Sequence, residues 1–247
     1  MSGAKVRGLA LGLSAIEMLV GARFPQGVTQ VASALGIAPS SAHDLLAALV
    51  DLGFVEREEA GHRYRLSPGV FRLVHQIAEH FGPNQKISNL LPGIAARHNA
   101  SIYIHTLCGL EAMLISAVGE YAPSTSLGVS TPAYASAAGK ILVAQLPEEH
   151  WPAFAPGAST KKFTRFTDTD PDHFLATIRL ARENGFVISE RASAIEVCAI
   201  AAPIPRGAGP AMYSVALVYE HHEWATKCLP DLKKVVFEVA DELARAL

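Results

Sequence analysis

VTQVASALGIAPSSAHDLLAALVDLGFVEREEAGHRYRLSPGVFRL, residues 28–73, is the stretch that decides the fold of the first part of the chain. Its apolar residues recur three and four positions apart, which predicts one helix over 30–35 and another over 39–52. Two short segments that favour extended structure follow at 54–57 and 63–66, and they predict a hairpin. The order of these elements is that of a helix-turn-helix followed by a wing.

Single residues indicate where these helices begin and end. Thr29 is expected to cap the first helix through its hydroxyl, and Pro39 suits the first position of the second. Gly36 is expected to turn the chain between them, and Gly53 to provide a left-handed stop. A further helix is predicted upstream by an apolar stripe of Leu9, Leu13, Ile16 and Val20. Three helices and a hairpin predict a winged helix-turn-helix domain over residues 1–66.

The pattern changes after the hairpin. A linker helix is expected over 67–83, with the domain boundary at Gly82-Pro83. The following unit, 84–247, is expected to contain helices at 85–98, 135–146, 171–184 and 230–247 and strands at 101–107, 112–118, 186–189, 197–204 and 213–219. This alternation predicts an antiparallel sheet with helices packed on it, so the fold class is α+β.

Composition limits the classes of protein that fit. The chain has 247 residues, 50% of them hydrophobic and 18% charged, so it can bury a core and is not disordered as a whole. Its formal net charge of -2 gives no general attraction to nucleic acid or to anionic membranes. Cys108, Cys198 and Cys228 lack the spacing of a metal site, and we expect a reduced, cytoplasmic protein with no contact to a membrane.

Three stretches resemble one protein family. Residues 28–73 are similar to the winged helix of the isocitrate-lyase-regulator (IclR) family of bacterial transcription factors. STPAYASAAGKILVAQLPEE at 130–149 resembles the family's pocket loop and helix, and NGFVISERASAIEVCAIAAPI at 184–204 resembles a later block. The resemblance implies a GAF-like effector-binding domain, a homodimer or homotetramer, and a small carboxylate or aromatic effector that changes operator binding.

The expected DNA contacts lie in the helix-turn-helix and in the wing. Side chains at the start of a recognition helix reach phosphates and base edges in the major groove, and two arginines on one face of a wing can enter a minor groove. The alternatives are a winged helix used only for packing and arginines that are simply solvated. The candidate residues are Thr29, Ser40, Ser41, His43, Arg63 and Arg65.

The N-terminal domain carries no excess of positive charge. Residues 1–80 contain seven bases and seven acids. The bases are Lys5, Arg7, Arg23, Arg57, Arg63, Arg65 and Arg72, and the acids are Glu17, Asp44, Asp51, Glu56, Glu58, Glu59 and Glu79. Because phosphate neutralisation supplies most non-specific affinity for DNA, we expect weak binding per protomer and a reliance on oligomerisation.

The expected effector site combines the loop at 127–140 with neighbouring strands. Turn formers, an aromatic ring and a hydroxyl precede a helix start, which suits an anionic ligand, although a plain surface loop would look similar. Ala216 and Val218 stand where the family often has serines, and Tyr134 where histidine is common, so an aromatic acid is expected to fit better than a small keto acid. The candidates are Gly128, Pro132, Tyr134, Ser136, Glu190, Cys198, Ala216 and Val218, with core packing the alternative for Cys198.

No motif indicates catalysis or metal binding. G-x-S-x-G, P-loop, G-x-G-x-x-G and H-E-x-x-H patterns do not occur, so no enzyme and no cofactor are expected. His221, His222 and Glu223 are adjacent on an expected strand end and would point to opposite faces, so no metal site is expected. The remaining histidines considered, His98, His105, His150 and His173, are expected to be solvated or hydrogen-bonded. The sequence therefore predicts a ligand-responsive transcriptional regulator; the alternative is a small-molecule-binding or hydrolytic protein of the same fold whose winged helix no longer binds DNA.

Overall fold

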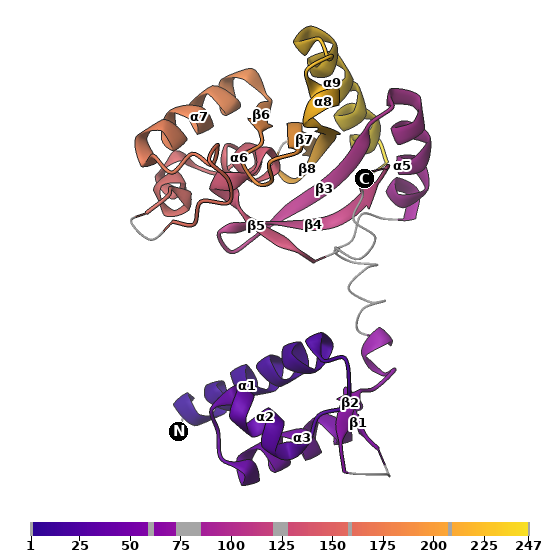
Figure 1. Cartoon of the computed structure of the whole chain (residues 1–247), viewed down its shortest axis with the longest axis vertical. Helices are drawn as coiled ribbons and strands as arrows, with labels where there is room; N and C mark the ends of the chain where they lie inside the picture. The colour runs from indigo at the N-terminus through magenta and orange to yellow at the C-terminus, as the bar shows by residue number, and fades with distance from the viewer. Residues whose placement is uncertain are drawn as a thin grey trace. The chain divides into compact units, whose positions relative to one another are not determined.

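The computed structural model describes residues 2–58, 62–72, 85–120, 128–157, 160–206 and 209–246. The chain divides into two compact units, Met1–Phe81 and Gly82–Leu247, and Figure 1 shows the elements of each.

The first unit has three helices and a two-stranded sheet. Its elements are α1 (Ser2–Gly21), α2 (Val28–Leu35), α3 (Pro39–Asp51), β1 (Val55–Arg57) and β2 (Tyr64–Leu66). The strands β1 and β2 are antiparallel, and the core beneath them is formed by buried residues of all three helices and both strands. No single helix in the described part of the chain is long and apolar enough to cross a membrane; α2 and α3 pass that test only as a pair, which is bent by 107°. A bend of that size is typical of a helix-turn-helix.

Most of the predicted helix signals hold in this unit. Gly36 and Gly53 have positive φ angles of 63° and 77°, and Pro39 occupies the first turn of α3. The prediction for Thr29 is wrong: α2 begins earlier than expected and its N-cap is Gly27, whose backbone N–H donates to Gln30 Oε1 at 2.8 Å. Thr29 instead lies in the first turn of α2, where its side chain is exposed.

The apolar stripe predicted for α1 is mostly at the surface. Leu9, Leu13 and Val20 are 67%, 56% and 65% exposed, whereas Ala15 and Leu19 on the same helix are buried in the core. The helix was predicted correctly, but its most apolar stripe is not the face that packs inside the unit. The predicted linker helix begins at Val70–Arg72, and its remainder, 73–83, lies outside the described residues.

The second unit is built on a six-stranded antiparallel sheet with the order β5-β4-β3-β8-β7-β6. Its strands are β3 (Ser101–Cys108), β4 (Glu111–Val118), β5 (Ser130–Pro132), β6 (Val187–Glu190), β7 (Val197–Arg206) and β8 (Gly209–Glu220). Its helices are α5 (Gln85–His98), α6 (Ala137–Val143), α7 (Pro171–Asn184), α8 (His221–Trp224) and α9 (Leu229–Ala244), with 3-10 turns η1 (Ala133–Ala135) and η2 (Glu148–Phe154). The predicted α+β class with an antiparallel sheet is confirmed, although His221 and His222 lie in the short helix α8 rather than on a strand end.

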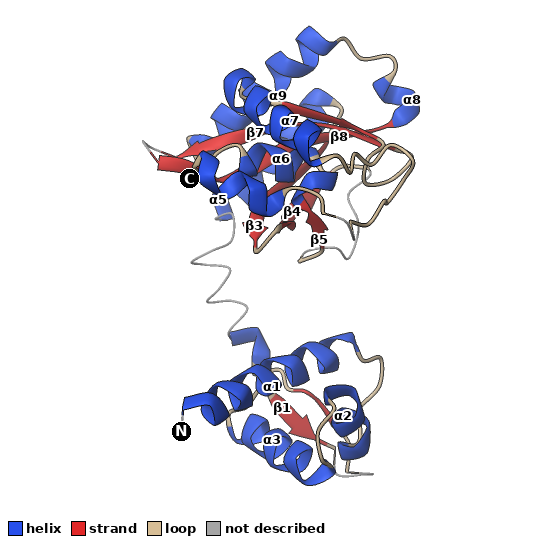
Figure 2. Ribbon diagram, turned by 90° about the vertical axis from the view of Figure 1, so that its left-hand side faces the viewer, coloured by secondary structure: helices blue, strands red, loops and turns tan. Residues whose placement is uncertain are grey.

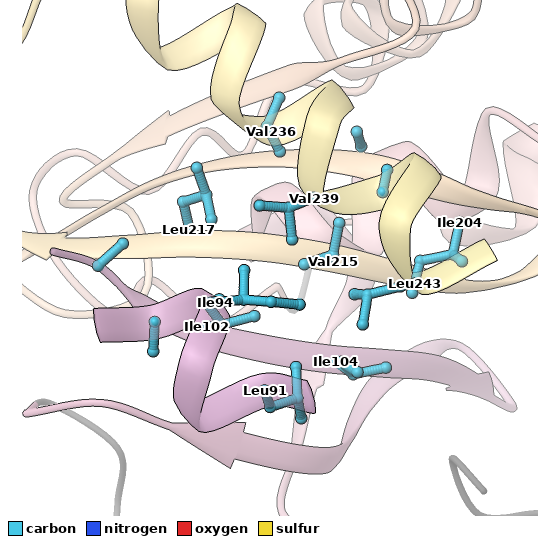
Figure 3. Packing of buried hydrophobic residues seen from close by; sticks show 14 of the residues in the cluster. Leu91, Ile94, Ile102, Ile104, Ile204, Val215, Leu217, Val236, Val239 and Leu243 are labelled. Atoms are coloured by element: carbon cyan, nitrogen blue, oxygen red, sulfur yellow. The ribbon is translucent and has the colours of Figure 1, made fainter. Parts of the chain in front are cut away.

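Helices cover both faces of this sheet (Figure 2). Successive side chains of a strand point to opposite faces, so Ile102 and Ile104 of β3 face α5 and α9, while Tyr103 faces the other side. Figure 3 shows the first of these cores, in which side chains of α5, β3, β7, β8 and α9 point toward one another. The second core lies between the sheet and α6, α7 and η2, and the candidate site lies at its border.

Candidate functional site

A cavity of about 120 Å³ lies on the face of the sheet that α6 covers. Its wall is formed by strands β3, β5, β6, β7 and β8, the start of α6 and the loop between β6 and β7. The apolar part of the wall consists of four alanines and two valines, among them Ala216 and Val218. The polar part consists of Tyr103, His105, Thr131, Ser136, Ser189 and Ser193.

The pairing of the strands brings these side chains together. Tyr103 lies opposite Ala216 in the ladder between β3 and β8, and Ser189 lies opposite Ala199 in the ladder between β6 and β7. Directly opposed residues of antiparallel strands share a face of the sheet. Residues far apart in the sequence therefore meet in one wall.

The start of α6 reaches the cavity because of one glycine. A Cβ on Gly139 would lie 2.5 Å from Ala133 Cα, so only glycine allows α6 to pack this closely on η1. Ser136 caps the helix, since its Oγ accepts from the Gly139 N–H at 3.0 Å, and it also lines the cavity. A serine hydroxyl that accepts one hydrogen bond retains a hydrogen to donate.

Two threonine hydrogen bonds fix the loop that contributes Ser193. Thr167 Oγ1 donates to the Ala192 carbonyl at 2.7 Å, and Thr164 Oγ1 donates to the Arg191 carbonyl at 2.6 Å. Arg191 has a positive φ of 59°, a conformation that is costly for a non-glycine residue and that these bonds help to hold.

His105 is the ionisable side chain of the cavity wall that departs most from its ordinary chemistry. The side chain is half-buried, and its Nδ1 is buried without a hydrogen-bond partner among the described residues. Burial lowers the pKa of His105 to about 4, so the ring is neutral at neutral pH. No described residue supplies the hydrogen bond that was expected for this histidine.

No charged group lines the described wall of the cavity. Lys140 on α6 is 8% exposed, burial lowers its pKa, and the charge of Asp168 opposes that change. Burial alone would raise the pKa of Asp168, but hydrogen bonds from the Asp170 N–H and from His173 lower it below its usual value. Lys140 and Asp168 thus interact with each other behind the wall.

The candidate DNA-binding side chains are at the surface of the first unit. Ser40, Ser41 and His43 are exposed on the first turns of α3, whereas Ala42 and Leu46 on its other face are buried. His43 Nδ1 lies 3.6 Å from Asp44 Oδ1. The helix therefore presents a polar, uncharged first turn to any nucleic acid.

The two wing arginines differ in their surroundings. Arg65 Nε donates to Glu56 Oε1 at 2.6 Å, and its Nη1 lies 3.4 Å from Glu58 Oε1, so Glu56 of β1 and Glu58 just after it already neutralise its charge. Arg63 is exposed and makes no ion pair with any residue that the structure describes. Arg63 is thus the more available of the two for a phosphate.

Two family models together match most of the chain. The model described as "Bacterial transcriptional regulator IclR C-terminal" matches residues 84–245, and "IclR helix-turn-helix domain" matches residues 8–59. The chain belongs to the IclR family. It is a transcriptional regulator of that family, with a helix-turn-helix domain and an effector-binding domain.

Similar IclR-type proteins come from several bacteria. The glycerol operon regulatory protein of Streptomyces coelicolor is 26% identical over 204 residues, which cover 81% of this chain and 79% of that protein. The p-hydroxybenzoate hydroxylase transcriptional activator of Acinetobacter baylyi is 27% identical over 225 residues, covering 83% and 78%. The crystal structure of an IclR homolog complexed with 4-hydroxybenzoate from Microbacterium hydrocarbonoxydans shares the fold, with a TM-score of 0.80, 18% identity and coverage of 97% and 98%.

Three of the predicted effector residues line the cavity: Ser136, Ala216 and Val218. Tyr134 does not, because its hydroxyl donates to the Lys161 carbonyl at 2.8 Å. Pro132 ends β5, and Gly128 precedes that strand, its N–H donating to the Leu114 carbonyl. These three residues shape the loop around the cavity rather than its wall.

Glu190 and Cys198 lie on the opposite face of the sheet from the cavity. They oppose each other in the β6–β7 ladder, and their neighbours Ser189 and Ala199 take the cavity face, so the pleat directs 190 and 198 away. The Sγ of Cys198 lies 3.6 Å from His221 Nδ1, and burial raises the pKa of the thiol, as its apolar setting predicts. Core packing, the alternative interpretation of Cys198, matches this position.

A larger hollow of about 300 Å³ lies between α5 and the ends of β3, β4 and β8. Its lining includes the carboxylates of Glu120 and Glu223, which would repel an anionic ligand. Among the described residues, no group of three or more His, Cys, Asp or Glu side chains is placed to hold a metal ion. The smaller cavity is therefore the better candidate for the effector site.

Proposed function

We propose that this IclR-family regulator binds operator DNA as a symmetric homo-oligomer and senses a small organic acid, most suitably one with a single aromatic ring. The observation that carries this proposal is the cavity of about 120 Å³ in the effector-binding domain. An apolar protein cavity of about 150 Å³ holds one benzene molecule, so a space of about 120 Å³ limits the ligand to about one ring or a short aliphatic chain.

The cavity wall supports an aromatic ligand. Ala216 and Val218 offer no hydrogen bond to a ligand, while Ser136, Ser189 and Ser193 offer hydroxyls. A ring against the apolar side and polar groups toward the serines would leave few groups unpaired, each of which costs about 1–3 kcal/mol. One relative is named for the activation of p-hydroxybenzoate hydroxylase, and one structural neighbour was crystallised with 4-hydroxybenzoate.

The first unit supplies the DNA contacts. Ser40, Ser41 and His43 are positioned to contact base edges or phosphates from α3, and Thr29 and Arg63 to contact phosphates from α2 and the wing. Arg65 contributes less because Glu56 holds its charge.

The exposed stripe on α1 favours an assembly of several copies. Leu9, Leu13 and Val20 form an apolar surface that a second copy can cover, and a symmetric dimer would present two recognition helices to a palindromic site. Binding of operator DNA by a bacterial regulator takes place in the cytoplasm, where the free thiols of Cys108, Cys198 and Cys228 remain reduced.

The proposal is tested by footprinting the full-length protein on the DNA upstream of its own coding region at low salt. A DNA fragment of equal length from inside the gene serves as the control. We expect a protected site with two-fold symmetry whose occupancy changes on addition of 4-hydroxybenzoate or benzoate. Ser41→Ala and His43→Ala should change the preferred bases rather than abolish binding. No protection at any protein concentration would favour a ligand-binding protein whose winged helix does not bind DNA.

A further inference from the structure

We propose that His105 is the residue that anchors the effector, and that an organic acid enters the cavity together with one proton shared between its carboxyl group and the His105 imidazole. This inference rests on the proposed ligand-sensing function and specifies its chemistry. None of the sequence motifs singles out His105 as a ligand contact.

The position of His105 supports the role of an anchor. It lies on β3 between Leu114 of β4 and Ser214 of β8, and its ring centroid is 6.2 Å from that of Tyr103. The hydroxyl of Ser214 donates to the Ala138 carbonyl rather than to the imidazole. The ring thus lines the cavity with its Nδ1 unpartnered among the described residues.

A bulge lies at this point of the sheet. The ladder between β3 and β4 pairs Ile104 with Ser116 and then His105 with Leu114, so Ile115 is an extra residue on β4. Bulges re-aim side chains and are frequent beside functional sites. The irregularity therefore occurs where the imidazole joins the cavity wall.

The charges around the cavity determine the form in which an acid can bind. The described wall contains no lysine, arginine or carboxylate, and an ionised carboxylate buried without a cation is strongly disfavoured. Tyr103, from β3 itself, lines the same wall, and Lys140 follows the wall residue Ala138 by two positions on α6, where its charge interacts with Asp168. Burial raises the pKa of Tyr103, so its phenol stays neutral and can only donate or accept a hydrogen bond.

The proton balance follows from these surroundings. At neutral pH a free carboxylic acid with a pKa of about 4 is ionised, and the buried imidazole is neutral. On binding, one proton is taken up from the solvent. It is shared in a hydrogen bond that runs either from a carboxyl O–H to an imidazole nitrogen or from an imidazolium N–H to a carboxylate. No other bond forms or breaks. The affinity should therefore weaken about tenfold for each pH unit above neutrality.

The test is isothermal titration calorimetry of the full-length protein with benzoate and with 4-hydroxybenzoate. Titrations at pH 7 in two buffers of different ionisation enthalpy measure the protons taken up, and titrations at pH 6, 7 and 8 measure the slope of affinity with pH. We expect an uptake of about one proton per ligand and a dissociation constant that rises about tenfold per pH unit.

A variant assigns the proton to His105. His105→Asn keeps a small hydrogen-bonding group beside Tyr103 but has no basic nitrogen, so proton uptake should vanish and the pH slope should flatten. His150→Asn is the matched control, because His150 is exposed on η2 and outside the cavity wall, and it should titrate like the wild type.

The outcomes separate this inference from the proposed function. Binding of either acid by the wild type without proton uptake would overturn the role of His105 and leave ligand sensing intact. Undiminished uptake in His105→Asn would overturn it as well and would point to Lys140. If the wild type bound neither benzoate, 4-hydroxybenzoate nor short aliphatic acids at millimolar concentration, both the role of His105 and the sensing of a small organic acid would be overturned. The wild-type titrations decide the question even if the variant does not fold.

Discussion

The imidazole of His105 has a buried nitrogen, Nδ1, that no described residue hydrogen-bonds. A buried polar atom without a partner destabilises a fold by about 1–3 kcal/mol, and the Nδ1 of His105 is such an atom among the described residues. A bound acid would supply the missing hydrogen bond. The free energy of that hydrogen bond would then contribute to the affinity for the acid.

The acid sensitivity of the second unit should reveal this histidine. Its pKa is about 4 in the folded protein, against 6.5 for an ordinary histidine. The unfolded chain therefore binds the proton more tightly, so the stabilising contribution is complete above pH 6.5 and is lost as the pH falls toward 4. Between pH 7 and pH 5, roughly 2 kcal/mol of the free energy of unfolding should disappear. His105→Leu should lose less over that range.

Urea unfolding followed by tryptophan fluorescence measures this difference. The two tryptophans, Trp151 and Trp224, both belong to the second unit, so the signal reports on the domain that contains His105. His150→Leu, at an exposed site, should follow the wild type at both pH values. Parallel loss of stability in His105→Leu and in the wild type would contradict the prediction.

At the scale of elements, local signals predicted the helices and strands but not what they bring together. Pro39, Gly36 and Gly53 mark the helix-turn-helix because backbone conformation there depends on single residues. Asp170 likewise caps α7, since its side chain accepts from the N–H groups of Asp172 and His173. Such signals need only neighbours in the sequence.

The cavity depends instead on the order and register of strands. Thr131, Ser189 and Ser193 were not expected to meet, because their contact follows from the order of the strands in the sheet, which the sequence pattern does not contain. Alternation along β3 was a usable signal, since it places His105 on the same face as Tyr103. Alternation along β6 and β7 does not by itself show that Glu190 and Cys198 share a face of the sheet. That conclusion also needs the pairing of the two strands, in which these residues oppose each other.

The packing of α6 on η1 should be sensitive to a single methyl group. Gly139→Ala would place a Cβ 2.5 Å from Ala133 Cα, so we expect the free energy of unfolding of the second unit to fall by about 1–3 kcal/mol and acid binding to weaken. Gly93→Ala is the matched control, because a Cβ on this residue of α5 would meet no atom within 4 Å. It should be neutral or stabilising by up to about 1 kcal/mol. Equal effects of the two substitutions would show that α6 can shift without cost.

At the scale of the whole molecule, the charge balance constrains how an IclR-family protein can bind its operator. Seven bases against seven acids over residues 1–80 leave no net attraction to DNA, and Glu56 and Glu58 hold the charge of Arg65. Each protomer therefore has few cations free for phosphates. Two protomers on a symmetric site would add their contacts, and base recognition by α3 would then decide where the dimer binds.

The salt dependence of operator binding should carry the signature of these few cations. Each neutralised phosphate contributes about 0.9 to the slope of log affinity against log salt, so a dimer using one or two cations per protomer should give a slope of roughly -2 to -4. Glu56→Gln should raise affinity and steepen the slope because it releases Arg65 from Glu56, whereas Arg63→Ala should make the slope shallower by about 2 per dimer.

Glu149→Gln is the control for net charge, because Glu149 is an exposed acid on η2, and it should leave the slope unchanged. Fluorescence anisotropy with a labelled operator at several salt concentrations measures all four slopes. Identical slopes for the wild type, Glu56→Gln and Arg63→Ala would mean that the wing does not touch phosphate, and the affinity would then have to come from α2 and α3 alone.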